Sequence, residues 1–221
     1  MKRTVVSLLF FFVLASALSA NAEFYVGGQV GFNAPRDLTD IQGTGAATGI
    51  TLSDLDLENG VVFGGKFGGY FANSLNWLGG ELEVYHTNSN IKQQQATISA
   101  PILGLSVSGT LPAADLAITT VAFNILVRYP HETWQPYAGI GGGINVARLS
   151  GGTTVSETAY LPSVNFLAGL KFFVTQHIAI FGEYKFNYGS SWEFEDNLME
   201  VDYSTNMFLG GASYHFDLNL I

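Results

Sequence analysis

The chain has 221 residues, of which 18 are acidic and 9 are basic, so its formal net charge is −9 at neutral pH. This excess of acid argues against nucleic-acid binding, which needs basic patches. The chain also has no cysteine, which excludes a disulfide framework. Its length is enough for one domain.

The first 22 residues have the pattern of a secretory signal peptide. Lys2 and Arg3 precede a largely apolar segment, and Ala20-Asn21-Ala22 is a small-x-small cleavage site. The apolar segment is short for a spanning helix, which needs about 20 residues. We therefore expect residues 1–22 to be removed and residues 23–221 to form the folded domain.

Beyond the signal peptide the hydrophobic period is two. Between Phe24 and Asn33, one phase is Phe, Val, Gly, Val and Phe, and the other is small or polar. This alternation predicts a strand with lipid on one side and a packed or wet lumen on the other. Eight segments share the pattern: Phe24–Asn33, Val61–Phe71, Leu78–His86, Ala117–Tyr129, Pro136–Val146, Pro162–Phe172, Ile178–Tyr188 and Met207–Phe216.

The connections between these segments alternate in length. Three are short, namely Ala72–Trp77, Pro130–Gln135 and Phe173–His177, and four are long, namely Asn33–Gly60, Thr87–Leu116, Ala147–Leu161 and Gly189–Asp202. Short periplasmic turns alternating with long extracellular loops are typical of a membrane barrel. The mature chain has no apolar run of about 18 residues, so it has no candidate for a spanning helix. The other structure that pairs every backbone group in lipid is a closed sheet. The sequence thus predicts an all-β, eight-stranded antiparallel up-and-down transmembrane barrel.

Two further features agree with a membrane barrel. Aromatic residues near the proposed strand ends predict interfacial girdles, namely Phe71, Trp77, Tyr129, Trp134, Trp192 and Tyr203. A soluble sandwich or lipocalin-like barrel would carry abundant charge on its polar face, whereas the non-apolar face here is mostly Gly, Ala, Ser and Asn.

A set of charged residues falls on the inward phase of the strands: Lys66, Glu81, Glu83, Arg128, Lys171, Glu183 and Lys185. The interior of an eight-stranded barrel is just wide enough for side chains to fill it, and buried charges there must be paired. Hairpin pairing about the turn near Ser74 places Lys66 opposite Glu83, and we expect these two to be direct partners. We expect Arg128 at a depth similar to that of Glu81. The set is either a packed ionic core, which we favour, or an ion path.

Other motifs carry weaker signals for chemistry. His86 lies on the lipid-facing phase, but a lipid A deacylase would need serine where Asn88 stands, and Ser89 falls on the opposite phase. No histidines have the spacing of metal ligands, and the acidic loops have no EF-hand-like spacing. The apolar second loop, Asn88–Asp115, is expected to form either a hairpin above the membrane or a ligand-facing mouth.

The chain resembles the small outer-membrane barrels of the outer membrane protein A transmembrane-domain type, within the porin-like surface barrels. The resemblance rests on the Phe24–Phe32 alternation, on Gln135-Pro136-Tyr137-Ala138-Gly139-Ile140-Gly141-Gly142-Gly143, and on Gly210-Gly211-Ala212-Ser213-Tyr214-His215-Phe216. One departure is that residues 217–221 extend past the closing aromatic Phe216, and Leu218 and Leu220 continue its outward phase.

The resemblance implies a monomeric surface barrel of the bacterial outer membrane, in contact with outer-membrane lipid and lipopolysaccharide. It implies no enzymatic activity, no cofactor and no metal, and loops that contact extracellular ligands. A narrow pore or carrier for small hydrophobic compounds is the first alternative. A lipid A-modifying enzyme is the second.

Overall fold

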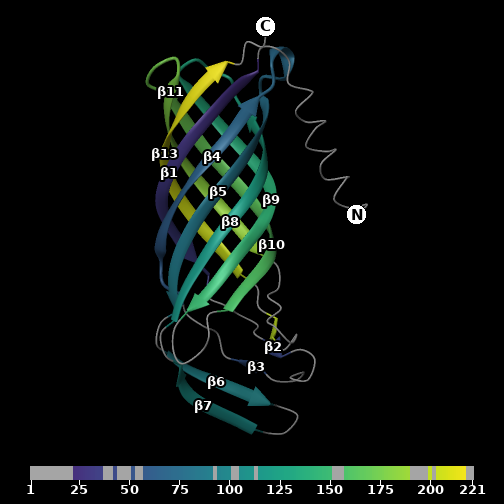
Figure 1. The fold of residues 1–221 in the computed structure, drawn as a ribbon, viewed down its shortest axis with the longest axis vertical. Coiled ribbons are helices and arrows are strands. Elements are labelled where there is room, and N and C mark those ends of the chain that lie inside the picture. The colour runs from purple at the N-terminus through teal and green to yellow at the C-terminus, as the bar shows by residue number, and fades with distance from the viewer. Residues whose placement is uncertain are drawn as a thin grey trace, which may run out of the picture.

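Eight long antiparallel strands close into one barrel in the computed structural model (Figure 1). The structure describes residues 22–36, 42–43, 51–52, 57–91, 94–100, 105–111, 114–150, 157–189, 199–200 and 203–217. The barrel strands are β1 (Glu23–Pro35), β4 (Gly60–Tyr70), β5 (Leu78–Ile91), β8 (Ala114–Arg128), β9 (Trp134–Ser150), β10 (Glu157–Phe173), β11 (Ile178–Gly189) and β13 (Tyr203–Asp217). The predicted signal peptide lies outside the described residues except for Ala22.

The strands follow one another around the barrel in chain order. The closed order is β1-β13-β11-β10-β9-β8-β5-β4, so the first strand pairs with the last. That closing pair runs from Glu23 opposite Asp217 to Pro35 opposite Thr205. Closure leaves no free strand edge in the barrel, which a membrane sheet requires. The predicted eight-stranded up-and-down architecture is therefore confirmed.

The two ends of the barrel differ. At one end, here called the turn end, three short connections join β4 to β5, β8 to β9 and β10 to β11. The first contains the 3₁₀ turn η2 (Asn73–Leu75), in which Asn73 has a φ of 60°, a conformation that asparagine tolerates well. Both ends of the described chain lie here, at the top of Figure 1. The opposite end, with the four long connections, is here called the loop end.

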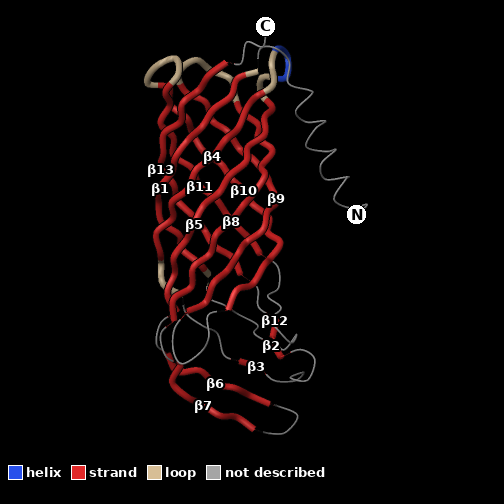
Figure 2. The backbone as a smooth tube through the Cα atoms, viewed as in Figure 1, coloured by secondary structure: helices blue, strands red, loops and turns tan. Residues whose placement is uncertain are grey.

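A second, smaller sheet lies beyond the loop end (Figure 2). It consists of β2 (Gln42–Gly43), β3 (Thr51–Leu52), β6 (Gln94–Ala100), β7 (Leu105–Leu111) and β12 (Met199–Glu200), in the order β12-β2-β3-β6-β7. Its largest part is the hairpin β6–β7, which pairs from Gln94 opposite Leu111 to Ala100 opposite Leu105. Of the two expectations for the second loop, the hairpin is the one that the described residues form.

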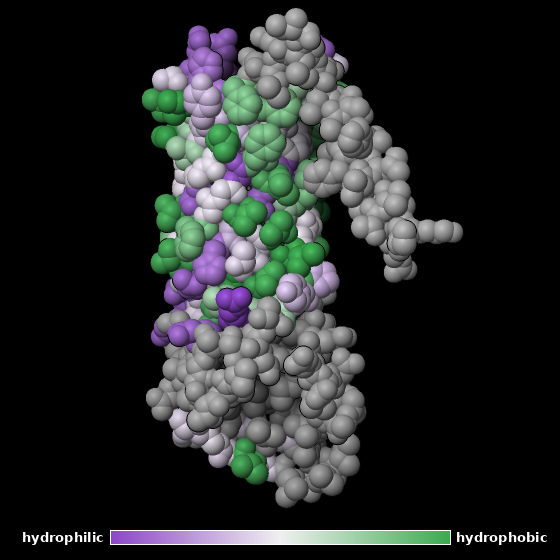
Figure 3. Space-filling model, in the orientation of Figure 1, coloured by the Kyte–Doolittle hydropathy of each residue, from purple (hydrophilic) through white to green (hydrophobic). Residues whose placement is uncertain are grey.

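Burial alternates along the barrel strands with period two. Val30 and Phe32 are more than half exposed, while Gln29 and Asn33 beside them are buried. In Figure 3 apolar side chains cover the wall of the barrel, and hydrophilic ones gather toward its two ends. The exposed apolar wall is the surface that meets lipid, and the buried phase fills the lumen.

Two details differ from the sequence-based expectations. The third long connection, predicted as Ala147–Leu161, is shorter than expected. The reason is that β9 and β10 continue to pair as far as Leu149 opposite Glu157. Tyr203 does not belong to an interfacial girdle. It lies on the odd-numbered phase of β13, which faces the lumen, and it is only 1% exposed. Trp192 lies outside the described residues.

Candidate functional site

The inward-facing polar side chains make the barrel interior the candidate site. All seven charged residues predicted to face inward are buried, with exposures from 0% for Glu83 and Lys185 to 8% for Arg128. The structure divides them into three groups: a middle ionic cluster of Lys66, Glu81, Glu83, Glu183 and Lys185, a separate Lys171, and Arg128 near the turn end.

The middle ionic cluster is made by three strands. Lys66 Nζ lies 2.9 Å from Glu183 Oε2, 3.5 Å from Glu81 Oε1 and 3.9 Å from Glu83 Oε1. Lys185 pairs with Glu83 and lies 3.2 Å from Glu183 Oε1. Each lysine thus contacts at least two carboxylates, which offsets the cost of taking these charges out of water.

Neutral side chains complete the cluster. Tyr25 donates to Glu81 at 2.6 Å, and Tyr137 donates to Glu183 at 2.7 Å. Gln29 donates to Glu83 at 2.6 Å, and the amide of Asn124 donates to both Glu81 and Glu83. Because these donors come from β1, β8 and β9, the cluster is bonded to strands on all sides of the lumen.

The predicted pairing of Lys66 with Glu83 needs a correction of detail. The two residues are opposite one another in the β4–β5 register, as the turn position predicts. The shorter ion pair of Lys66 is with Glu183, across the lumen on β11. A hairpin pattern defines the partner on the neighbouring strand, but it contains no information about a strand on the far side of the barrel.

Lys171 has a different environment. Its side chain is buried, and its ammonium has no hydrogen-bond partner among the described residues. Its Nζ lies 3.6 Å from the ring centroid of Tyr25, 5.3 Å from that of Tyr70 and 5.4 Å from that of Tyr137. The ammonium is therefore held by cation–π contacts with three tyrosine rings.

A third group closes the turn end. Arg128 Nη2 lies 2.6 Å from Glu23 Oε2, and His215 Nδ1 lies 2.6 Å from Glu23 Oε1. Arg128 also donates to Gln135 Oε1 at 3.0 Å and to the carbonyl of Asn76 at 2.9 Å. The prediction that Arg128 lies at the depth of Glu81 is wrong. Glu81 lies opposite Asn124, which is farther from the turn end along β8 than Arg128 is. Arg128 instead contacts Glu23 and Asn76 at the turn end.

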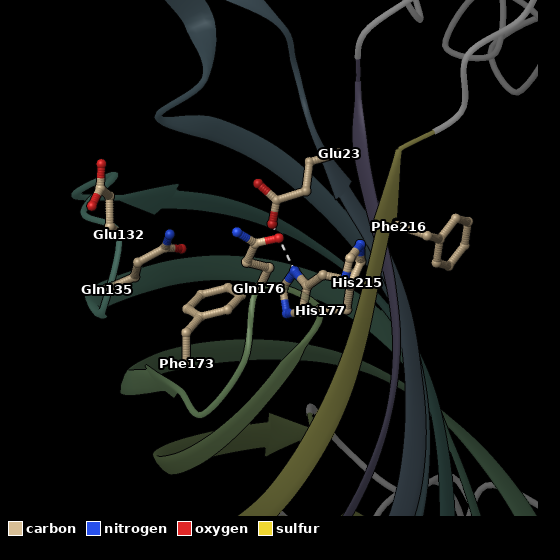
Figure 4. A pocket seen from close by; sticks show the side chains of 8 residues that line it. All are labelled: Glu23, Glu132, Gln135, Phe173, Gln176, His177, His215 and Phe216. Atoms are coloured by element: carbon tan, nitrogen blue, oxygen red, sulfur yellow. Dashed lines mark hydrogen bonds and ion pairs between the residues drawn. The ribbon is translucent and has the colours of Figure 1, made fainter.

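A cavity of about 500 Å³ opens at this end, and Figure 4 shows the side chains that line it. The pair of Glu23 and His215 projects into it from β1 and β13, while Gln176 and His177 come from the turn between β10 and β11. The lining is largely polar, as expected for a mouth that meets water.

Toward the loop end the lumen is filled by neutral amides and hydroxyls. Asn145 donates to Asn187 at 3.0 Å, and Asn187 donates to Asn165 at 2.8 Å. Thr120 and Tyr85 donate into the same chain of bonds, at Asn145 and Asn165. This amide layer joins β5, β8, β9, β10 and β11 across the lumen.

The outward His86 does not form a catalytic pair with Ser89. Its two ring nitrogens bond to the hydroxyl of Thr119 and to the side-chain oxygen of Asn88, both at 2.9 Å. Ser89 faces the lumen and accepts a bond from Asn33 at 2.8 Å. A serine nucleophile needs its base within hydrogen-bond reach, and the wall of the barrel separates these two.

Sequence reasoning did not identify the tyrosines and asparagines as partners of the charges. Tyr25, Tyr137 and Asn124 lie on the inward phase, which was visible in the sequence. Their contacts depend on the order and stagger of non-neighbouring strands. The residues of the interior could be predicted, but most of their pairings could not.

The comparisons with known proteins agree with this architecture. Residues 4–216 match the family described as the outer membrane protein beta-barrel domain. No curated protein matches the chain. No helix among the described residues is long and apolar enough to cross a membrane.

Several solved structures share the fold. Neisserial surface protein A is 14% identical, with 90% of this chain and 98% of that chain covered, at a TM-score of 0.54. The outer membrane protein OprG from Pseudomonas aeruginosa is 15% identical, with 90% and 98% covered, at a TM-score of 0.53. A major outer membrane protein from Thermus thermophilus is 12% identical, with 88% and 99% covered, at a TM-score of 0.51. At these identities the likeness shows the fold alone. Because the family match covers nearly the whole chain, the protein belongs to the outer membrane protein beta-barrel domain family and lies in the bacterial outer membrane.

Proposed function

We propose that this protein is a non-enzymatic surface barrel with a closed lumen, which supports the envelope and contacts the outside of the cell through its four long loops. The observation that carries the proposal is the stack of three bonded layers across the lumen. From the turn end these are the Glu23–Arg128 group, the middle ionic cluster and the amide layer around Asn187.

The charge balance of the interior supports a structural role. The three buried glutamates Glu81, Glu83 and Glu183 each form an ion pair with Lys66, Lys185 or both, and Glu23 forms one with Arg128. If the lumen were an ion path, a passing ion would have to displace some of the side chains in these ion pairs. Fixed pairs with protein donors on several strands instead hold the strands in register.

The loop end supports a role in surface contact. The hairpin β6–β7 carries exposed side chains from Ser106 to Thr110, including Val107 at 69% exposure. In a single-chain bacterial barrel the long loops face outward and the short turns face the periplasm. The exposed side chains of this hairpin are therefore on the side of the barrel where another surface would meet the protein.

A complementation experiment tests the proposal. A strain without the gene receives the intact protein, or a variant in which residues 94–111 are replaced by a short Gly-Ser link. Deoxycholate sensitivity reports envelope integrity, and the rate at which cells sediment from suspension reports surface contact. We expect both proteins to restore deoxycholate resistance, and only the intact protein to restore sedimentation.

Two results would contradict the proposal. A change in lipid A mass that depends on the protein would establish the enzymatic alternative. Accumulation of a small hydrophobic dye that depends on the protein, with no effect on deoxycholate resistance, would establish the carrier alternative.

A further inference from the structure

A patch on the lipid-facing wall differs from the rest of the barrel. It spans β1, β13 and β11, which are consecutive around the barrel. Phe32 pairs with Phe208, and Phe208 pairs with Tyr184, so three outward aromatic side chains form one row across three strands. Their rings touch, with centroids 5.3 Å apart for Phe32 and Phe208 and 5.4 Å for Tyr184 and Phe208.

On the turn side of this row the wall is hollowed. The next positions across the three strands are Val30, Gly210 and Gly182. A Cβ added at Gly182 would meet nothing within 4 Å. Together with the aromatic row, these residues line a shallow cavity of about 480 Å³ on the outside of the barrel. An open apolar depression at this depth faces acyl chains.

On the loop side of the row, the outward positions of β13 become polar. Ala34, Asn206 and Phe186 come first, and Tyr184 donates a hydrogen bond to Asn206 Oδ1 at 2.7 Å. Ser204 comes next, and its carbonyl accepts from the backbone of Arg36 at 2.9 Å. The patch therefore grades from an apolar hollow, through an amide and a hydroxyl, to a cation at the loop end.

Arg36 is an unusual charge in this acidic chain. Of the basic residues that the structure describes, only Arg36 and Arg148 are exposed, and the others face the lumen. The Arg36 guanidinium lies 5.6 Å from the centroid of the Phe186 ring. In the described part of the chain no carboxylate lies within ion-pair distance of it. Its fork of donors is suited to a phosphate.

We propose that this patch binds one phosphorylated glycolipid of the outer leaflet. A phosphate of the headgroup lies on Arg36, the sugar and its amide-linked carbonyls meet Ser204 and Asn206, and an acyl chain crosses the Phe32–Phe208–Tyr184 row into the hollow at Gly182 and Gly210. Charge selects the phosphate, and the side chains of Asn206 and Ser204 on β13, close to the cation, offer an amide and a hydroxyl to a sugar. The inference depends on the position of the barrel in the outer membrane, and not on whether its lumen is closed.

Native mass spectrometry of the purified barrel, titrated with diphosphorylated lipid A, tests the proposal. We expect one tightly bound lipid. Arg36→Gln should weaken its binding about tenfold, equivalent to about 1.4 kcal/mol, while Arg148→Gln, an exposed arginine on another face of the same end, should leave it unchanged. Gly182→Leu, which fills the hollow, should weaken binding of lipid A with or without its phosphates.

The two variants should separate headgroup from acyl chain. With lipid A stripped of its phosphates, Arg36→Gln should bind as well as the wild type. Heat-modifiable migration on gels shows that each variant is folded before it is titrated. Equal binding of phosphatidylglycerol and lipid A would overturn the choice of a glycolipid. Equal effects of Arg36→Gln and Arg148→Gln, or no effect of Gly182→Leu, would overturn the site.

Discussion

At the scale of single residues, Lys66 is the side chain on which the middle ionic cluster depends most. It is in contact with all three glutamates of the cluster, and Glu183 is the nearest at 2.9 Å. Removing one member of a buried ion pair leaves the other charge without compensation, which costs more than the pair itself contributes. Replacing one charged residue of the cluster should therefore lower the stability of the barrel more than replacing both members of an ion pair.

A double-mutant cycle measures which partner of Lys66 dominates. We expect Lys66→Met to lower the free energy of unfolding by about 3–5 kcal/mol, because it strands a buried glutamate. The coupling with Glu183→Gln should be larger than the coupling with Glu83→Gln, since Lys66 Nζ lies 2.9 Å from Glu183 Oε2 but 3.9 Å from Glu83 Oε1. Urea unfolding in phospholipid vesicles, followed by tryptophan fluorescence, gives both values. Additive losses for Lys66 and Glu183 would contradict the contact across the lumen.

Lys171 provides the contrasting case. Its ammonium is held by tyrosine rings and makes no hydrogen bond to a glutamate among the described residues. Lys171→Met should therefore cost no more than about 1 kcal/mol, because no carboxylate loses a bonded partner and the thioether can contact the same rings. The same urea titration compares it with Lys66→Met. Equal losses for the two variants would mean that Lys171 balances the glutamates as directly as Lys66 does.

At the scale of the strands, glycine on one strand makes room for tyrosine on the next. A Cβ added at Gly68 would lie 2.6 Å from both Cζ and the hydroxyl of Tyr25, and one at Gly79 would lie 2.6 Å from Cδ1 of Tyr70. A Cβ at Gly169 would lie 2.5 Å from Cζ of Tyr137. The three tyrosines that surround Lys171 thus each lie over a glycine of a neighbouring strand.

Gly68→Ala tests this arrangement. The added methyl group must displace the ring of Tyr25 from Glu81 and Lys171, and we expect a loss of about 1–3 kcal/mol, the usual cost of overpacking. Gly28→Ala is the matched control, because a Cβ there meets nothing within 4 Å. The control should be neutral or stabilising by about 0.5–1 kcal/mol, since alanine is less costly to order than glycine. Equal urea midpoints for the two variants would contradict the account of the packing.

The strands also show how far the sequence alone leads. The facing of each strand could be predicted, because period-two alternation separates Val30 and Phe32 from Gln29 and Asn33. The Lys66–Glu83 register followed from the short turn between β4 and β5. The contacts of Lys66 with Glu183 and of Tyr25 with Glu81 join strands that are not neighbours. They depend on the stagger of the closed barrel, which no local pattern records.

At the scale of the whole molecule, the protein divides into a closed barrel and a projecting loop end. The sidedness of this arrangement is testable, because the chain has no cysteine of its own. Ser108→Cys, in the exposed hairpin β6–β7, should react with a membrane-impermeant maleimide on intact cells. Glu132→Cys, in the short turn between β8 and β9, should react only after lysis. Labelling of Glu132→Cys on intact cells would invert the topology.

The central claim is that the bonded layers close the lumen, and single-channel recording in a planar lipid bilayer tests it most directly. Purified wild-type protein, shown to be folded by heat-modifiable migration, is inserted into the bilayer in concentrated KCl. We expect no stepwise current above the bare bilayer, because Glu23–Arg128, the middle ionic cluster and the amide layer each cross the lumen. Regular current steps that change in size or ion selectivity on replacing Lys66 by Met would contradict the claim and establish a pore.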